Sequence, residues 1–425
     1  MNYAAAKGVF DILPKDPHPD GQWRASYIWQ YVEEIIHALA KTYGFAEIRT
    51  PIFEKTELFI RGVGESSDIV TKEMYTFEDR AGRLMTLRPE GTAAVMRSFV
   101  ENRLDQVLGS SKLYYIGPMF RYERPQAGRY RQHHQFGVEA IGDSSPEQDV
   151  EVIDLLCTFY RKLGLKNLTV MLNSVGDAKS REEYRHSLRQ FLQPHLPSLS
   201  EESQVRFEKN VLRILDSKSP QDQKLLENAP MILEFLSEEA KNRFEQVKAL
   251  LTKLGLPYEI NPNLVRGLDY YNQTVFEVTS GELGAQNAIG AGGRYDGLTA
   301  LLGGPHLPAV GFAAGLERII QTMLAQNVPL PPRPHPKLFL IPIGDEAKTI
   351  CTELLFSLRH KGIAAEINWK SKKVGKALEQ AALLQADYAT VVGEEELSTQ
   401  TLKVKDLATR QEVSVPLNHL EQFLS

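Results

Sequence analysis

Residues 120–142 read FRYERPQAGRYRQHHQFGVEAIG, two segments with strand character joined by a basic loop. Arginine recurs in the loop among aromatic residues, at Arg121, Arg124, Arg129 and Arg131. A guanidinium group binds phosphate through two parallel hydrogen bonds and also stacks on aromatic rings. The stretch therefore predicts two sheet strands with a phosphate-binding loop between them, although a basic stretch taken alone is often only a solvated hairpin.

Further strand candidates surround these two segments. A helix precedes them: the apolar positions of residues 22–43 recur at helical spacing, which predicts an amphipathic helix that ends at Gly44. Residues 44–54 then have strand character interrupted by Pro51, which a sheet edge tolerates. The other candidates are KEMYTFE, RLMTLRP, KLYYIGPMFRYE, HHQFGVEAIG, TVFEVTS and AVGFAAG. Several consecutive strands predict an α+β fold with an antiparallel sheet and flanking helices.

The chain changes character twice along its length. Residues 177–257 carry charged helical patterns without strand signals, which predicts a helical insertion. Residues 329–336, PLPPRPHP, predict a stiff proline-rich linker. Residues 337–425 alternate strand and helix, as a small α/β domain does. The first domain is therefore expected in two parts, residues 1–176 and 258–328.

Composition narrows the classes of function. The chain has 425 residues, 42% of them hydrophobic, and a net charge of −5, so it predicts a folded protein without overall attraction for polyanions. Any nucleic-acid contact must be local. Cys157 and Cys351 lie too far apart in the sequence to suggest a disulfide framework or a cysteine zinc site. Without a secretory signal or an 18-residue apolar run, we expect a cytoplasmic protein with no membrane contact.

Four other stretches contain residue types that carry chemistry, and each has a structural alternative. The stretches are LVRGLDYY with Arg266, Asp269, Tyr270 and Tyr271; GAGGRYDGL, residues 290–298; GLERII with Glu317 and Arg318; and LRPEGT with Glu90 and Thr92. The tyrosines could instead be core residues, and the glycines could form a tight turn. The glutamates could be favourable partners of a helix N-terminus.

Taken together, these stretches resemble one family, the class II histidyl-tRNA synthetases. The matching order is TPIFE, LRPEGT, FRYERPQAGRYRQHHQFGVEAIG, LVRGLDYY, GAGGRYDGL and GFAAGLERI. The FRYE and GLER segments are similar to motifs of class II synthetases in general, whereas LVRGLDYY and GGRYDGL are similar to segments of the histidine enzymes. The resemblance implies an ATP-dependent ligase that activates L-histidine as an adenylate and transfers it to tRNA(His).

The resemblance also implies roles for the arginines. Arg121 and Arg266 are the catalytic residues, facing the α-phosphate of ATP from opposite sides, and Glu123 meets the adenine amino group. Arg129 and Arg318 face the departing pyrophosphate, together with the Mg²⁺ that accompanies ATP. We expect no metal site formed by the protein's own residues, no zinc and no organic cofactor.

The amino acid has its own set of implied residues. Among them Glu90, Thr92 and Gln135 hold the α-amino group, while Glu139 and Tyr271 bracket the imidazole nitrogens. The full set is Glu90, Gly91, Thr92, Arg121, Gln135, Glu139, Arg266, Tyr270 and Tyr271.

Contacts with tRNA and with a second copy follow from the same resemblance. Arg124 and Gln126 match loop residues near the tRNA acceptor end, although Ala127 stands where the family often has a basic residue. The insertion resembles the segment that closes over the acceptor arm, and the C-terminal domain resembles the family's anticodon-binding domain. That domain has a basic face at Lys370, Lys372, Lys373 and Lys376. The segment around Pro51 resembles the family's homodimer interface.

Two alternative functions compete with this interpretation, and the first belongs to a different functional class. A catalytically inactive paralogue could bind histidine as the regulatory subunit of ATP phosphoribosyltransferase, but such paralogues tend to lose the catalytic arginines and the C-terminal domain. Here Arg121, Arg266 and Arg318 are all present. A class II synthetase for another amino acid disagrees with LVRGLDYY. Because His133 and His134 are adjacent on a predicted strand, they face opposite ways and do not suggest a shared metal.

Overall fold

The computed structural model describes residues 3–65, 67–108, 111–123, 128–281, 288–370 and 373–424. The chain forms two compact units that divide between Pro331 and Pro332, inside the predicted linker. Residues 328–336 contain neither helix nor strand. None of the helices in the described ranges is long and apolar enough to cross a membrane.

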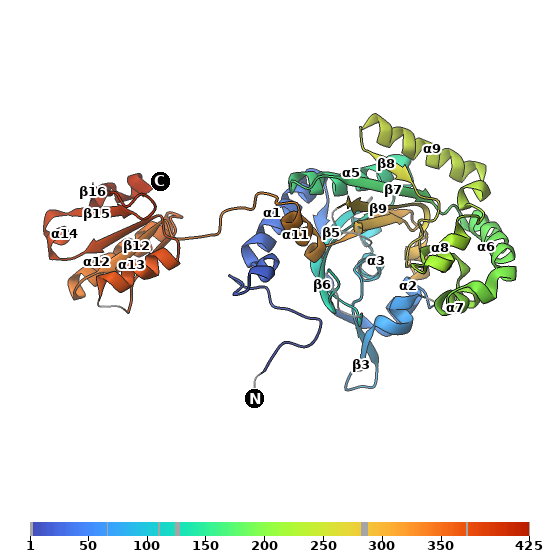
Figure 1. The fold of residues 1–425 in the computed structure, drawn as a ribbon, viewed down its shortest axis with the longest axis horizontal. Helices are drawn as coiled ribbons and strands as arrows, with labels where there is room; N and C mark the ends of the chain where they lie inside the picture. The colour runs from blue at the N-terminus through green and yellow to red at the C-terminus, as the bar shows by residue number, and fades with distance from the viewer. Residues whose placement is uncertain are drawn as a thin grey trace. The chain divides into compact units, whose positions relative to one another are not determined.

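The first unit is built on an eight-stranded sheet of order β1-β5-β6-β11-β10-β9-β7-β8 (Figure 1). Its body is antiparallel, as predicted, and only the edge strands β1 and β8 pair in parallel. The strands are β1 (Ala46–Glu47), β5 (Ser111–Phe120), β6 (Gln132–Ile141), β7 (Leu168–Ser174), β8 (Tyr258–Ile260), β9 (Asn272–Ser280), β10 (Ala288–Arg294) and β11 (Ala309–Gly315). The two segments around the basic loop thus become the paired strands β5 and β6.

The glycine-rich stretch of residues 290–298 is a turn only in its second half, at Asp296 and Gly297. Its first half is the strand β10, which lies between β9 and β11. A Cβ atom on Gly292 would lie 2.1 Å from the carbonyl oxygen of Gly311 on β11. Strand pairing requires glycine here, and the absence of branched side chains hid the strand from propensity.

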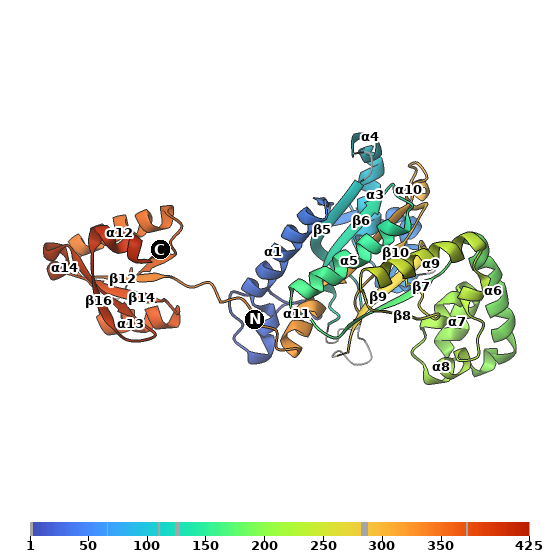
Figure 2. The same cartoon turned by 90° about the horizontal axis from the view of Figure 1, so that it is seen from above.

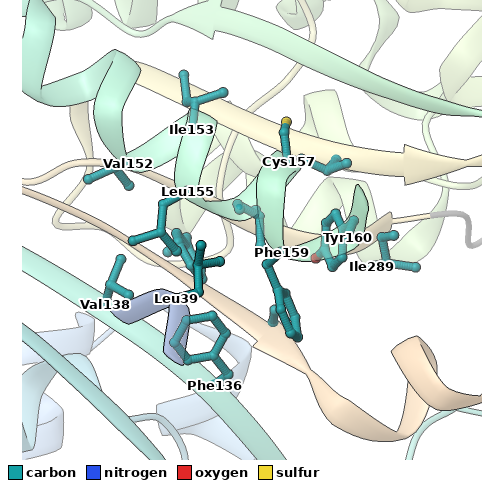
Figure 3. Packing of buried hydrophobic residues seen from close by; sticks show 14 of the residues in the cluster. Leu39, Phe136, Val138, Val152, Ile153, Leu155, Cys157, Phe159, Tyr160 and Ile289 are labelled. Atoms are coloured by element: carbon teal, nitrogen blue, oxygen red, sulfur yellow. The ribbon is translucent and has the colours of Figure 1, made fainter. Parts of the chain in front are cut away.

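One face of the sheet packs against helices around the main apolar core. Phe136 and Val138 of β6 point to this face and lie in one apolar cluster with Leu155 and Phe159 of the covering helix (Figure 3). The ring of Phe312 belongs to the same cluster, 5.2 Å from that of Phe136. The covering helices are α1 (Ser26–Thr42), α5 (Pro146–Lys162), α9 (Glu238–Lys253) and α11 (Leu316–Ala325). The predicted first helix begins four residues later than expected, because a 3-10 helix, η1 (Pro19–Arg24), precedes it.

The opposite face of the same strands is covered only in part. There α3 (Thr92–Glu101) packs Met96 and Phe99 against Leu113 and Tyr115 of β5. Beside it lie α2 (Thr56–Val63), a π-helical turn η2 (Ile69–Glu73), α4 (Leu104–Leu108), α10 (Leu298–Leu301), and a small sheet of β2 (Phe53–Lys55), β4 (Leu84–Leu87) and β3 (Tyr75–Glu78). The partly covered face is the one that carries the polar side chains described below.

Residues 177–257 contain helices and no strand, as predicted. Their elements are α6 (Ala178–Leu192), η3 (Gln193–Ser198), α7 (Glu201–Lys209), η4 (Val211–Asp216), α8 (Pro220–Leu226) and η5 (Ile232–Phe235), followed by α9. Figures 1 and 2 both show α6, α7 and α8 grouped beside the β7 and β9 end of the large sheet. They have an apolar core of their own, which includes Tyr184, Leu188 and Ile214.

The second unit contains a five-stranded sheet of order β13-β12-β14-β15-β16. The strands β12 (Leu338–Pro342), β13 (Ala365–Ile367) and β14 (Tyr388–Val392) pair in parallel, as predicted. The antiparallel strands β15 (Thr401–Asp406) and β16 (Glu412–Pro416) were not predicted. The helices are α12 (Asp345–His360), α13 (Val374–Leu383), α14 (Glu394–Thr399), the 3-10 turn η7 (Leu417–His419) and α15 (Leu420–Leu424).

Candidate active site

Glu139 lies at the centre of a buried polar cluster on the partly covered face of the sheet. Its side chain comes from β6 and the residue is only 1% exposed. One carboxyl oxygen accepts a hydrogen bond from the Thr92 hydroxyl at 2.8 Å, and the other accepts one from the Tyr295 hydroxyl. Burial raises the pKa of Glu139 to about 8. The carboxyl group is therefore largely protonated at pH 7, and it is held in one orientation.

Glycines make room for this cluster. Gly311 is directly opposite Glu139 in the β6–β11 pair, and a Cβ there would lie 2.2 Å from the Glu139 carboxyl group. The Tyr115 ring fits between Gly91 and Gly137, where added Cβ atoms would lie 2.3 and 2.2 Å from it. A larger residue at any of these positions would displace a site side chain.

Glu90 anchors the start of α3 beneath the same cluster. Its two carboxyl oxygens accept hydrogen bonds from the backbone N–H groups of Thr92 at 2.7 Å and Ala93 at 2.8 Å. The structural alternative for Glu90, a partner of a helix N-terminus, is thus part of its role. Burial raises its pKa, although these hydrogen bonds favour the charged form. The capping fixes Gly91 and Thr92 beside Glu139.

The predicted residues of LVRGLDYY close the cluster from the other side. The rings of Tyr270 and Tyr271 lie 4.6 Å apart, and Tyr270 meets the Tyr295 ring edge-on at 5.4 Å. The guanidinium of Arg266 lies 5.9 Å from the centre of the Tyr271 ring and pairs with Glu277 on β9. Asp269 instead faces away from the cluster, toward Asn210 at 3.0 Å.

Three buried polar atoms at this site have no hydrogen-bond partner among the described residues: the Tyr115 hydroxyl, Gln135 Oε1 and Arg266 Nε. Buried polar groups in folded proteins are almost always paired, by protein or by another molecule. Together with the partly covered face, the three atoms indicate that a polar ligand completes the site.

A basic group lies at the end of β5, next to the predicted phosphate-binding loop. Arg121 donates a hydrogen bond to the Pro89 carbonyl at 2.8 Å, and Glu123 pairs with Arg129 at 3.3 Å. Arg318 on α11 donates to the carbonyls of Gly128 at 3.2 Å and Ala288 at 2.8 Å.

Electrostatics at this basic group favour an anion. Burial, and after it the neighbouring Arg129, lowers the pKa of Arg318. Like charges held this close gain from an anion between them. The predicted tRNA-contacting residues Arg124 and Gln126, with Ala127, lie outside the described residues.

The adjacent histidines point to opposite faces of β6, as predicted. His134 donates its backbone N–H to Glu317 of α11 at 2.8 Å, and its Nδ1 lies 3.0 Å from the same carboxylate. Glu317 therefore ties α11 to the sheet. Burial, and next the charge of Arg121, lowers the pKa of His133 to about 3, so His133 stays neutral on the site face. Nowhere in the described ranges do three or more His, Cys, Asp or Glu residues gather as metal ligands.

Sequence reasoning did not select Tyr115, Glu277, Tyr295 or Gly311 as site residues. All four lie inside segments with strand or glycine-rich patterns, and strand alternation was the signal that could have placed Glu277 and Tyr295. The places of Tyr115 and Gly311 in the site depend on which strands pair across the sheet, and no local sequence pattern indicates the strand pairing.

Two hollows lie apart from the polar cluster. One, of about 330 Å³, is bordered by α6, Asn210 and Asp269. The other, of about 560 Å³, lies beside Pro51, Leu58 and Arg97. Neither contains the residues that carry the buried carboxyl or the basic group, so the cluster itself is the candidate active site.

The raised pKa of Glu139 predicts how stability depends on pH without ligand. The folded protein holds this proton up to about pH 8, whereas the ordinary pKa is 4.5. Between those pH values the unfolded chain binds fewer protons than the folded protein. The contribution of Glu139 to the free energy of unfolding is therefore full below pH 4.5 and is lost as pH rises toward 8. Urea unfolding of wild type and Glu139→Gln from pH 4.5 to 9 measures this contribution. The stability difference should shift in favour of Glu139→Gln with rising pH, and a constant difference would contradict the shift.

Comparisons with known proteins fit this geometry. A family model described as histidyl-tRNA synthetase matches residues 24–319, and one described as an anticodon binding domain matches residues 337–425. A histidine–tRNA ligase from Protochlamydia amoebophila (strain UWE25) is 56% identical over the full length of both chains. The crystal structure of apo S. aureus histidyl-tRNA synthetase superposes with a TM-score of 0.83 at 38% identity, covering both chains completely.

A further solved structure bears on the regulatory alternative. A protein from Bacillus halodurans C, titled an ATP phosphoribosyltransferase regulatory subunit/histidyl-tRNA synthetase, has a TM-score of 0.66 at 20% identity. It covers 92% of this chain, and this chain covers 99% of it. At that identity the likeness concerns the fold alone, so it does not favour the regulatory role.

Proposed function

The chain belongs to the histidyl-tRNA synthetase family, and we propose that its buried Glu139 cluster selects L-histidine for activation with ATP and transfer to tRNA(His). The observation that carries the proposal is the buried carboxyl of Glu139, which is hydrogen-bonded to Tyr295, whose ring lies 6.1 Å from that of Tyr271. A site with buried hydrogen-bonding groups rejects amino acids that leave those groups unpaired, typically by about 10⁴-fold or more.

In the activation step, a histidine carboxylate oxygen forms a bond to the α-phosphorus of ATP, and the bond from that phosphorus to the bridging oxygen breaks. Pyrophosphate leaves with the electron pair. The nucleophile is already an anion and needs no base, so the main barrier is bringing two anions together. Arg121 and Arg266 are proposed to neutralise that repulsion. Arg129 and Arg318 then receive the charge on pyrophosphate, with Mg²⁺ entering as part of the MgATP substrate.

Histidine recognition is assigned to the opposite side of the cluster. Glu139 and Tyr271 pair with the imidazole nitrogens, and Gln135, with its unpaired Oε1, accepts from the α-amino group beside Glu90 and Thr92. Glu123 is assigned to the adenine amino group. Gly91 and Tyr270 shape the pocket around these contacts.

Contacts with tRNA are assigned to the C-terminal unit and to the basic loop. The C-terminal unit, whose exposed lysines include Lys370, Lys373 and Lys376, binds the anticodon. The loop with Arg124 and Gln126 meets the acceptor end. A protein with this activity works where translation occurs, which we take to be the cytoplasm.

Charging of unfractionated tRNA with labelled histidine tests the proposed function. We expect ATP-dependent incorporation of histidine into an acid-precipitable, base-labile product. Tight histidine binding without any charging would instead favour the regulatory subunit of ATP phosphoribosyltransferase, the second candidate.

A homodimer is proposed through the small sheet near Pro51. Apolar side chains are exposed on it, and Phe53 and Phe77, at 50% and 43% exposure, pack against each other. Burial of such a patch is worth about 25 cal/mol per Å². We expect Phe53→Asp to shift the protein to monomer in analytical ultracentrifugation. Leu254, an exposed residue at the C-terminal end of α9, serves as the control, because Leu254→Asp should stay dimeric. A monomeric wild type would contradict the proposed interface.

A further inference from the structure

The loop that carries Arg266, Tyr270 and Tyr271 has no regular structure of its own. Residues 261–271 contain only turns and bends between β8 and β9. On the sheet side, Asn173 of β7 donates to the carbonyls of Pro262 and Leu264 at 3.1 and 3.0 Å. Other hydrogen bonds must hold the half of the loop that contains the site residues.

Three of those bonds come from the helical segment. Arg213 of η4 donates to the Gly267 carbonyl at 2.8 Å, one residue after Arg266. Asn210, at the end of α7, donates to the Asp269 carboxylate at 3.0 Å, and Arg181 of α6 donates to the Tyr271 carbonyl at 2.7 Å. Three helical elements thus hold three successive points of one loop.

Arg213 is itself fixed by the body of the unit. The residue is 8% exposed, and its second guanidinium nitrogen pairs with Asp68 at 2.7 Å. Asp68 also pairs with Arg206 of α7 at 3.4 Å. One nitrogen of the Arg213 guanidinium pairs with Asp68 and another donates to the Gly267 carbonyl. Because the guanidinium is planar and rigid, it fixes the loop backbone at Gly267 relative to Asp68.

The loop is close-packed where Asn210 reaches it. The Asp269 backbone N–H donates to the Val63 carbonyl at 3.2 Å, and a Cβ on Gly64 would lie 2.3 Å from the Asp269 carboxylate. Gly64 also has a φ of +102°, which favours glycine. Asp269 is therefore held both by α2, through Val63, and by Asn210 of the helical segment.

We propose that Arg213, aided by Asn210 and Arg181, is a positioning residue for histidine activation: the helical segment sets the backbone of the loop that carries Arg266, Tyr270 and Tyr271. The proposal rests on the proposed function of that loop. It makes the helical segment necessary for histidine binding even when no tRNA is present. ATP binding depends mainly on Arg121, Arg129 and Arg318, which these contacts do not touch.

Histidine-dependent ATP–pyrophosphate exchange by the full-length protein, without tRNA, tests the proposal. Displacement of binding groups by about 1 Å typically costs on the order of 100-fold, so Arg213→Gln should raise the KM for histidine by about 10- to 100-fold and, because the same loop carries Arg266, should also lower kcat. The KM for ATP should stay within about twofold. Arg189→Gln is the matched control, because Arg189 donates to the Glu208 carbonyl and lies over the Phe207 ring, and among the described residues it makes no hydrogen bond to the loop.

Asn210→Ala is the second variant, because Asn210 is less buried than Arg213 and its loss threatens folding less. Asn210→Ala should also raise the KM for histidine and leave the KM for ATP nearly unchanged. Values of KM for histidine within twofold of wild type in both variants would overturn the positioning role. A parallel rise of both KM values, or an equal effect of Arg189→Gln, would overturn it too. Failure of wild type to exchange with histidine would overturn the proposed function itself.

Discussion

Glu139→Ala is expected to abolish selective use of histidine. The side chain is fully buried and holds the hydroxyls of Thr92 and Tyr295, so its removal leaves those groups and the bound imidazole without their partner. Truncating one member of a buried hydrogen-bonded pair costs about 2–5 kcal/mol, or about 30- to several-thousand-fold in kcat/KM. Exchange kinetics with histidine measure the loss.

Glu139→Gln is the matched control for this variant. The amide keeps the shape and can still accept from the Thr92 hydroxyl, so the protein should fold and retain more activity than Glu139→Ala. Normal histidine exchange by Glu139→Ala would contradict the assignment of the carboxyl group to the imidazole.

Arg266→Gln should produce the second large effect, and mainly in kcat. Its guanidinium is oriented by Glu277 and the Tyr271 ring while Nε is left unpaired among the described residues, which suits a group that meets charge formed during the reaction. Loss of one oriented donor to such charge typically costs about 10²- to 10³-fold in rate. Single-turnover formation of the adenylate measures the chemical step directly.

Arg266→Lys provides the comparison for that prediction. It keeps the positive charge but not the planar fork, so its rate should lie between those of wild type and Arg266→Gln. A normal adenylate rate in Arg266→Gln, with only a raised KM for histidine, would assign Arg266 to ground-state binding alone.

Much of the fold could be predicted from local patterns. The period of the apolar residues located α1 within a few residues, and alternation with turn residues located β5, β6, β9 and β11. β10 was missed because its glycines resemble a turn, and β15 and β16 because the short α/β pattern before them dominated the prediction for residues 337–425. Propensity is a weak guide wherever strand partners decide the structure.

The candidate site could be predicted in part, and mostly through resemblance. Local composition marked Arg121 as an anion-binding candidate, whereas the role of Arg266 came from the resemblance. The pairing of Glu139 with Tyr295 requires β6 and β10 to flank β11. The roles of Tyr115, Gly137 and Gly311 likewise depend on strand register. The contacts from Arg213 and Asn210 to the loop join residues more than 50 positions apart, which no local pattern indicates.

Amino-acid-dependent ATP–pyrophosphate exchange, with each of the twenty amino acids tested separately and without tRNA, addresses the central claim most directly. The Glu139 cluster predicts exchange with histidine and none above background with the other nineteen. Exchange with a different amino acid would contradict the assignment of Glu139 and Tyr271, and histidine binding without exchange would contradict the assignment of Arg121 and Arg266.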